Sequence, residues 1–215
     1  MTYLNLMNSV LRRLREEETT SVTSTTYVKM VGDFINDAKT LVGQAADWSA
    51  LRETLIITTA ASDNTYSLTG GSDNIKVMSM LNDTHNCFME YQTKDWFNEA
   101  LYIGNASEGT PQYYTYNGLD ANGDTQILVG PTPDGVYTIR VDTVKRQVDL
   151  SADADTLLIP SQPVIHLAVA LLARERGETG GTSTAEYFTI ANQYLSDAIA
   201  IDAAKHPEEM VFRTI

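Results

Sequence analysis

Hydrophobic side chains recur at intervals of three and four residues along the first part of the chain. This spacing places them on one face of a helix, and it predicts two helices, at residues 3–15 and 27–46. Between them, residues 18–26 are almost wholly Ser, Thr and Glu, a composition typical of a loop. Ser24 or Thr25 is predicted to cap the second helix, because a hydroxyl there can accept a hydrogen bond from a free backbone amide.

From residue 51 to residue 159 the pattern is that of a sheet. β-branched and aromatic residues alternate or cluster in short runs, and Gly, Asn, Asp and Pro separate the runs. A short helix is predicted at residues 95–103, where apolar side chains return to helical spacing. The predicted strands are residues 52–59, 65–68, 75–81, 87–92, 112–116, 126–129, 136–145 and 157–159.

Two junctions in this region are predicted turns. Residues 120–124 contain an Asn-Gly step, which suits a backbone with positive φ. Residues 131–135 contain two prolines and end on a glycine. Each turn is predicted to join two antiparallel neighbours.

The last third of the chain returns to helical periodicity. One helix is predicted to begin with Ser161 or Gln162 as its cap and with Pro163 in its first turn, and to end near Arg176. A capping-box pattern at residues 183–186 begins the final helix.

Helices at both ends of the chain and strands between them predict an α+β fold. We expect a discontinuous helical bundle domain formed by residues 1–50 and 160–206. An antiparallel β-domain, a sandwich or a barrel-like structure, is inserted at residues 51–159, and residues 207–215 form a C-terminal tail. Of the net charge of the chain, −9 falls in residues 52–158, which makes the β-domain the acidic part.

The composition sets limits on function. The 215 residues are 43% hydrophobic and 20% charged, so the chain is predicted to fold around a substantial core. Its net charge of −13 disfavours proteins that read nucleic-acid sequences, because they need clustered cations to bind phosphates. No apolar run approaches the length of a membrane helix, so no membrane partner is expected, and the single cysteine excludes a disulfide within the chain.

Candidate catalytic residues are few. The histidines are His85, His166 and His206, and none lies in a nucleophile or metal motif. His85 and Cys87 alternate in a predicted strand and could share a face, but a packed thiol is the favoured interpretation. We therefore expect no catalytic residues, no cofactor and no metal, and we predict that the protein is not an enzyme.

A ligand-binding β-domain is the alternative. Acidic residues at 120–124 and 149–155 offer oxygen ligands to calcium, although neither segment has the Gly and Glu positions of an EF-hand loop, and turns are favoured. Tyr113, Tyr114 and Tyr116 could stack on sugars, although aromatic residues that alternate in a strand more often pack across a sheet. The alternative function is a monomeric carbohydrate-binding protein, with or without calcium.

The end of the chain carries apolar residues that no nearby segment supports. Met210, Val211, Phe212 and Ile215 lie in a stretch too short to build a core of its own. Burial in a partner gains about 2 kcal/mol for each large side chain, which can offset the entropy lost on ordering. We predict that this tail docks into another protein.

Several stretches of the sequence together follow a known pattern. They are the helical pair that ends in Trp48, residues 55–59 leading to 64–68, residues 111–116, the strand, Pro-containing turn and Tyr-bearing return strand of residues 126–140, residues 153–163 leading into a helix, and residues 185–194. In these stretches the chain resembles the head-to-tail adaptor proteins of tailed bacteriophages, the group that includes tail tubular protein A. The resemblance spans nearly the whole chain.

The resemblance implies a structural role in the virion neck, without an active site. It implies a homo-oligomeric ring, typically of twelve copies, that is assembled in the host cytoplasm and binds the portal protein through its helical domain and C-terminal segment. The β-domain faces the tail nozzle or tube, and genomic DNA passes through the lumen without specific binding. An acidic surface suits such a channel because it repels phosphate.

Two sets of contact residues are predicted on this basis. The subunit-interface set lies on the helix that follows Ser161, which is apolar on most sides, and comprises His166, Leu167, Arg174 and Arg176. The portal-docking set comprises Met210, Val211, Phe212, Arg213 and Ile215, in which Arg213 pairs with an acidic group of the portal protein.

Overall fold

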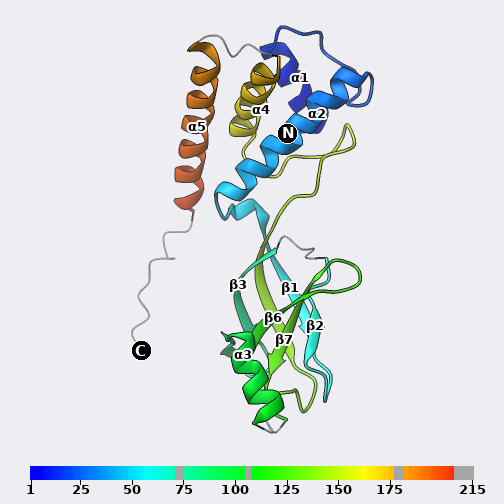
Figure 1. The fold of residues 1–215 in the computed structure, drawn as a ribbon, viewed down its shortest axis with the longest axis vertical. Coiled ribbons are helices and arrows are strands. Elements are labelled where there is room, and N and C mark those ends of the chain that lie inside the picture. Colours follow the sequence, from blue (N-terminus) through cyan, green and yellow to red (C-terminus); the bar gives the residue numbers. More distant parts are fainter. Residues whose placement is uncertain (71–74, 105–107, 177–181, 206–215) are drawn as a thin grey trace. The chain divides into compact units, whose positions relative to one another are not determined.

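The computed structural model describes residues 1–70, 75–104, 108–176 and 182–205, and it divides the chain into two compact units (Figure 1). One unit contains residues 1–51 and the segment that begins at Arg146. The other unit is Arg52–Lys145. The fold is therefore α+β, with a sheet region inserted between helices at the two ends of the chain, as the sequence predicts.

Helix α4 is the centre of the helical unit. This unit contains α1 (Tyr3–Arg13), α2 (Thr26–Ala45), α4 (Ser161–Glu175) and α5 (Thr182–Ala203). Helix α4 packs against α5, α2 and α1, and residues 163–165 and 168–173 are all buried. Because consecutive residues point to different sides of a helix, such a run shows that α4 is covered on nearly every side.

The predicted helix caps are confirmed at α2 but not at α4. The Thr25 hydroxyl accepts a hydrogen bond from the backbone amide of Val28 at 3.2 Å, so Thr25 is the N-cap of α2. The prediction that Ser161 or Gln162 caps α4 is wrong, because both are already helical and Pro160 holds the cap position without a side-chain hydrogen bond. The side chains of residues 182–184 lie outside the described part, so the capping box of α5 stays a prediction.

Residues 146–159 belong to the helical unit, whereas the sequence placed them in the sheet region. The predicted strand at 157–159 is absent, and Thr156 forms only an isolated bridge with Thr2. Residues 146–159 lead the chain from the sheet region back to the helices, and we call them the returning segment. Side chains of α2 hold this segment in place. The amide group of Asn36 donates to the carbonyl oxygen of Leu150 at 3.1 Å and accepts from its backbone amide at 2.9 Å.

Lys39 makes a second set of contacts with the returning segment, which we call the Lys39 clamp. This lysine is 2% exposed, and its Nζ donates to the carbonyl oxygens of Gln147 at 3.2 Å and Val148 at 2.8 Å. It also pairs with the Asp149 carboxylate at 2.8 Å. A buried ammonium is tolerated only when it is hydrogen-bonded in this way, so Lys39 and the loop determine each other's position.

The sheet unit consists of two sheets, each with four strands in the described residues. One has the order β1-β8-β3-β4 and the other has the order β2-β7-β6-β5. The strands are β1 (Arg52–Thr58), β2 (Thr65–Ser67), β3 (Ile75–Asn82), β4 (Cys87–Phe88), β5 (Glu90–Tyr91), β6 (Tyr113–Leu119), β7 (Thr125–Gly130) and β8 (Thr138–Lys145).

The core of this unit receives apolar side chains from both sheets. Ile139 and Val141 of β8 and Ile127 and Val129 of β7 are fully buried in one cluster. Alternate residues of each strand therefore enter a shared core, the arrangement of a sandwich. Ile57, Leu68, Met80, Met89 and Tyr114 complete the cluster.

Two details of the predicted strands differ from the structure. The strand predicted at 87–92 is divided into β4 and β5, which join different sheets, and β5 pairs with β6 in parallel. The turn at 120–124 joins antiparallel neighbours as predicted, and Gly123 there has a φ of 85°. Residues 131–135 do not join antiparallel neighbours, because they lead from β7 in one sheet to β8 in the other. Their two prolines lack the N–H that a continuing ladder needs.

A short helix, α3 (Lys94–Phe97), lies near the predicted position and continues as a π-helical turn at Asn98–Ile103. The Phe97 ring is fully buried. A Cβ at Gly130 of β7 would lie 2.9 Å from this ring, so the absence of a side chain at Gly130 allows α3 to pack closely on the sheet.

The contact between α1 and α2 generates the first prediction. A Cβ at Gly32 would lie 2.3 Å from the hydroxyl oxygen of Tyr3, whose side chain is buried. We expect Gly32→Ala to lower the free energy of unfolding by about 1–3 kcal/mol, because the ring must move within a packed core. The matched control is Gly43→Ala on the same helix, where nothing lies within 4 Å and a gain of about 0.5–1 kcal/mol is expected. Urea denaturation measures both, and equal stabilities would contradict the prediction.

The clamp at Lys39 generates the second prediction. We expect Lys39→Met to lower the free energy of unfolding by about 1–3 kcal/mol, because two carbonyl oxygens and a carboxylate lose their shared donor. Lys29→Met on the exposed side of α2 is the control, with an expected change within about 0.5 kcal/mol. Thermal unfolding followed by circular dichroism tests this pair, and a Lys39→Met protein as stable as its control would disprove the role of the clamp.

Candidate interaction surfaces

The predicted subunit-interface residues lie on α4, where they contact neighbouring helices of the same chain. His166 is half-buried, and its ring stacks on that of Tyr194 in α5, with ring centres 4.4 Å apart and planes 8° apart. Burial, and then the positive charge of Arg13, lower the pKa of His166, which favours the neutral ring. Leu167 beside it is also half-buried.

The two arginines fasten the end of α4 to the beginnings of α5 and α2. The exposed Arg174 guanidinium lies 5.7 Å from the centre of the Phe188 ring in α5. Arg176 pairs with Glu16 at 2.7 Å, donates a hydrogen bond to the Tyr27 hydroxyl and lies 5.4 Å from the centre of that ring. Such cation–π contacts hold a guanidinium over an aromatic face. His166, Arg174 and Arg176 therefore support the outer helices.

The other end of α5 is fastened to the segment that follows α2. The Asp202 carboxylate accepts hydrogen bonds from the Ser49 amide at 2.8 Å and the Ser49 hydroxyl at 2.5 Å, and it pairs with Lys205 at 3.0 Å. Burial raises the pKa of Asp202, but the hydrogen bonds from Ser49 and the charge of Lys205 outweigh burial and lower it. Both ends of α5 are thus fixed beside the corresponding ends of α2.

One side of α5, beside its contact with α4, carries exposed apolar side chains. Ala191 is the one buried side chain among those described on α5. Ile190 and Tyr194 are each 40% exposed, and Ile201 is 67% exposed. Large apolar side chains that share one side of a helix and remain exposed are typical of an interaction surface.

The sheet unit has an aromatic cluster on β5 and β6. The Tyr91 ring lies 5.7 Å from that of Tyr114 and 6.0 Å from that of Tyr116. Tyr113 packs instead against Trp96 of α3, with ring centres 4.9 Å apart. The predicted packing across the sheet is confirmed for Tyr114 and Tyr116, whose aromatic neighbour is Tyr91 on the adjacent strand, whereas Tyr113 packs on α3.

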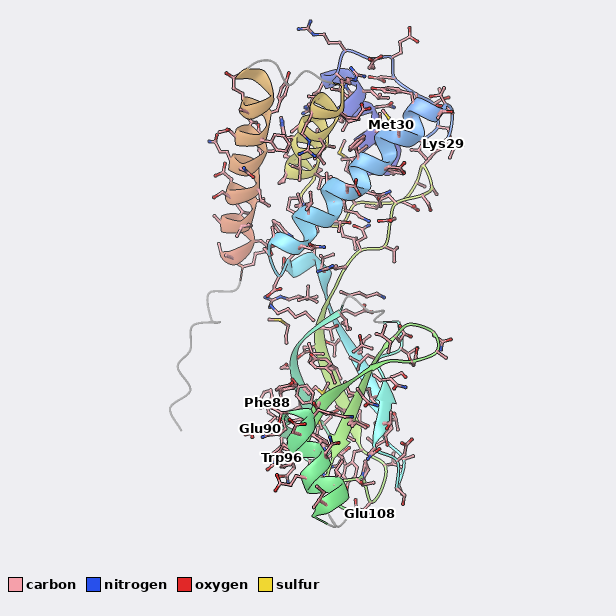
Figure 2. The ribbon with its side chains drawn as sticks, viewed as in Figure 1. Lys29, Met30, Phe88, Glu90, Trp96 and Glu108 are labelled. Carbon is pink, nitrogen blue, oxygen red and sulfur yellow. The ribbon has the colours of Figure 1, made fainter. Side chains whose placement is uncertain are left out.

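Part of this cluster is exposed at the edge of the sheets. Phe88 and Tyr91, on the short edge strands β4 and β5, are more than half exposed, and Trp96 and Tyr116 are partly exposed. We call these four residues the aromatic edge. Figure 2 shows Phe88 and Trp96 on the same side of the sheet unit, with Glu90 between them in the view. These partly exposed aromatic rings offer apolar area to a partner.

The acidic segments that the sequence offered as calcium ligands accept hydrogen bonds from amides of their own loops instead. One oxygen of Asp120 accepts from the amides of Asn122 and Asp124, at 2.8 and 2.9 Å. Asp155 accepts from the amides of Ala152 and Ser151, and these bonds lower its pKa. Within the described residues no cluster of three or more His, Cys, Asp or Glu side chains could hold a metal ion. The carboxylates act as hydrogen-bond acceptors that shape turns.

The predicted alternation of His85 and Cys87 in one strand is wrong. β4 begins at Cys87, and His85 lies in the preceding turn, which contains Asn86 at a positive φ of 53°. The His85 ring packs beside Tyr137, with centres 5.4 Å apart. His206 and the portal-docking residues Met210, Val211, Phe212, Arg213 and Ile215 lie outside the described residues.

Comparison with known families matches residues 1–210 to the model of the SU10 adaptor protein. No curated protein sequence matches the chain. None of the helices in the described ranges has the length and apolar character needed to cross a membrane. The family match confirms the predicted likeness to bacteriophage adaptors, whereas likeness to tail tubular protein A in particular stays a prediction. Because the match covers nearly the whole chain, the protein belongs to the SU10 adaptor protein family, a family of structural bacteriophage adaptors.

Proposed function

We propose that this protein forms a ring, of about twelve copies by family analogy, between the portal and the tail nozzle or tube of a bacteriophage, around the channel through which DNA passes. The observation that carries the proposal is the adaptor family match over residues 1–210. The ring lies in the virion neck, is assembled in the host cytoplasm and has no catalytic role.

The charge of the chain supports a channel that DNA traverses without being held. The net charge is −13, and the sheet unit contains twelve acidic and five basic residues. Phosphate-binding proteins need the opposite charge, because release of counterions by clustered cations supplies most of their affinity. A negative wall repels the duplex at every point and leaves no site where it would be trapped.

The helical unit is assigned to the portal and to the contacts between copies. The subunit-interface set His166, Leu167, Arg174 and Arg176 belongs to this unit, where His166 and Arg174 contact α5 and Arg176 contacts Glu16 and the beginning of α2. The sheet unit is assigned to the tail, and its aromatic edge is the surface offered to the tail protein. Exposed aromatic side chains suit this task because they bury a large area with few rotatable bonds.

The C-terminal residues are assigned to docking in clefts between portal subunits. Met210, Val211, Phe212 and Ile215 supply apolar burial, and Arg213 pairs with an acidic portal residue. Arginine suits such a pairing because its guanidinium can hold a carboxylate through two hydrogen bonds.

Deletion of residues 208–215 tests the docking assignment. We expect the truncated protein to lose at least about ten-fold in affinity for purified portal rings, because several large apolar side chains no longer become buried. Co-sedimentation with portal rings over a range of concentrations measures the loss. The matched control replaces Glu208 and Glu209 by Gln in the full-length chain and should bind as the unmodified protein does. Undiminished binding by the truncated protein would remove the docking assignment.

A further inference from the structure

Two rows of side chains in the helical unit are half-buried or exposed and have the same spacing. On α2 the row consists of Met30, Phe34, Asp37 and Leu41, and we call it the α2 row. On α5 the row consists of Ile190, Tyr194, Asp197 and Ile201, and we call it the α5 row. In each row the intervals are four, three and four residues, so each forms a straight strip about 16 Å long on the helix surface.

The α2 row lies away from the side on which α2 is buried. The α5 row borders the packed side of α5, because Tyr194 also stacks on His166 of α4. Helix α2 is buried through other positions, among them Val31, Ile35 and Val42, and Leu41 of the α2 row is 51% exposed. All four residues of the α5 row are exposed. Figure 2 labels Met30, the first residue of the α2 row, and Lys29 beside it on α2. Each strip thus leaves three large apolar side chains without full cover in the isolated chain.

We infer that the α5 row of one copy packs against the α2 row of the next copy, so that subunits join head to tail. This inference rests on the proposed ring and adds the surfaces that close it. A ring needs two different patches on each subunit, because a patch that pairs with itself produces a closed dimer. The two rows are such patches, since they lie on different helices that both pack against α4.

Charge favours this unlike pairing over a pairing of two α5 rows. Helix α5 contains three acidic residues and no Lys or Arg. On α2 the exposed charged residues are Lys29, Asp33 and Asp37, because Lys39 is buried. Two α5 surfaces would bring together the exposed Glu186 and Asp197 of each copy with no cation between them, whereas α2 offers the exposed Lys29. A pairing of two α2 rows would leave the α5 row uncovered.

The direction of the two helices fits a ring with a small rotation between neighbours. Arg174 and Arg176, at the end of α4, contact the beginnings of α5 and α2. Asp202, near the end of α5, binds Ser49, which follows the end of α2. The helices therefore run in the same sense within one copy, and a small rotation keeps that sense between copies. If the two rows paired in register, Asp37 would lie beside Asp197 and the two carboxylates would repel each other. Displacing one helix along the other by one turn separates them.

Two single substitutions and their mixture test the inference. Leu41→Glu damages only the α2 row, and Ile201→Glu damages only the α5 row. Both positions are more than half exposed, so folding should be unaffected. The control is Val148→Glu, a change of similar character at a residue of the same unit that is 76% exposed. Mass photometry and sedimentation velocity, with and without purified portal rings, measure the assembly of the full-length chain.

We expect each row variant to assemble at least about ten-fold more weakly than the unmodified chain and the control. An equal mixture of the two variants should form pairs and nothing larger, because the intact α5 row of one meets the intact α2 row of the other. Row variants that assemble like the control, a mixture that remains monomeric, or an unmodified chain that stays monomeric even on portal rings would each overturn the inference. Failure of the unmodified chain to bind portal rings would instead overturn the proposed function.

Discussion

The burial of α4 is the constraint on which the helical unit depends. Six of its consecutive residues, Ala168–Ala173, are buried, so this helix is stable only when other helices cover it from more than one side. Helices α1 and α2 from the start of the chain and α5 from its end provide this cover. Helix α5 contacts the rest of the unit through a narrow side around Ala191. Because α4 is buried, the helices that cover it form the outer surface of the unit.

The same unit has to accept a chain that returns from the inserted sheet region, and polar side chains solve this problem. The returning segment has no regular partner strand in the described residues, so its backbone groups need other acceptors and donors. Asn36 satisfies both backbone groups of Leu150, and Lys39 satisfies the carbonyl oxygens of Gln147 and Val148. A surface of α2 that could have been filled by apolar packing is instead used to fix a loop.

The sequence predicts features that depend on neighbouring residues better than those that depend on distant ones. Helix α2 lies within one residue of its predicted bounds, because periodicity and the Thr25 cap are local signals. The partner of His166 is Tyr194, and no spacing rule connects residues on separate helices. The sheet exchange at residues 131–135 was missed for the same reason. The role of Lys39 could have been predicted from the sequence, since a lysine between the buried positions Ala38 and Val42 interrupts an apolar row.

The corrected domain boundary changes the distribution of charge and therefore the argument about the channel. With Asp149, Asp153 and Asp155 in the helical unit, the sheet unit carries −7 and the rest of the chain −6. Those three carboxylates accept hydrogen bonds from Lys39 or from backbone amides, so they shape loops, yet the charge they carry still contributes to the field outside the protein. Both units are therefore acidic, and a channel wall built from either one repels phosphate. Passage of DNA through the proposed ring then does not require one particular unit to line the lumen, which leaves the exposed rows of α2 and α5 and the aromatic edge available for protein contacts.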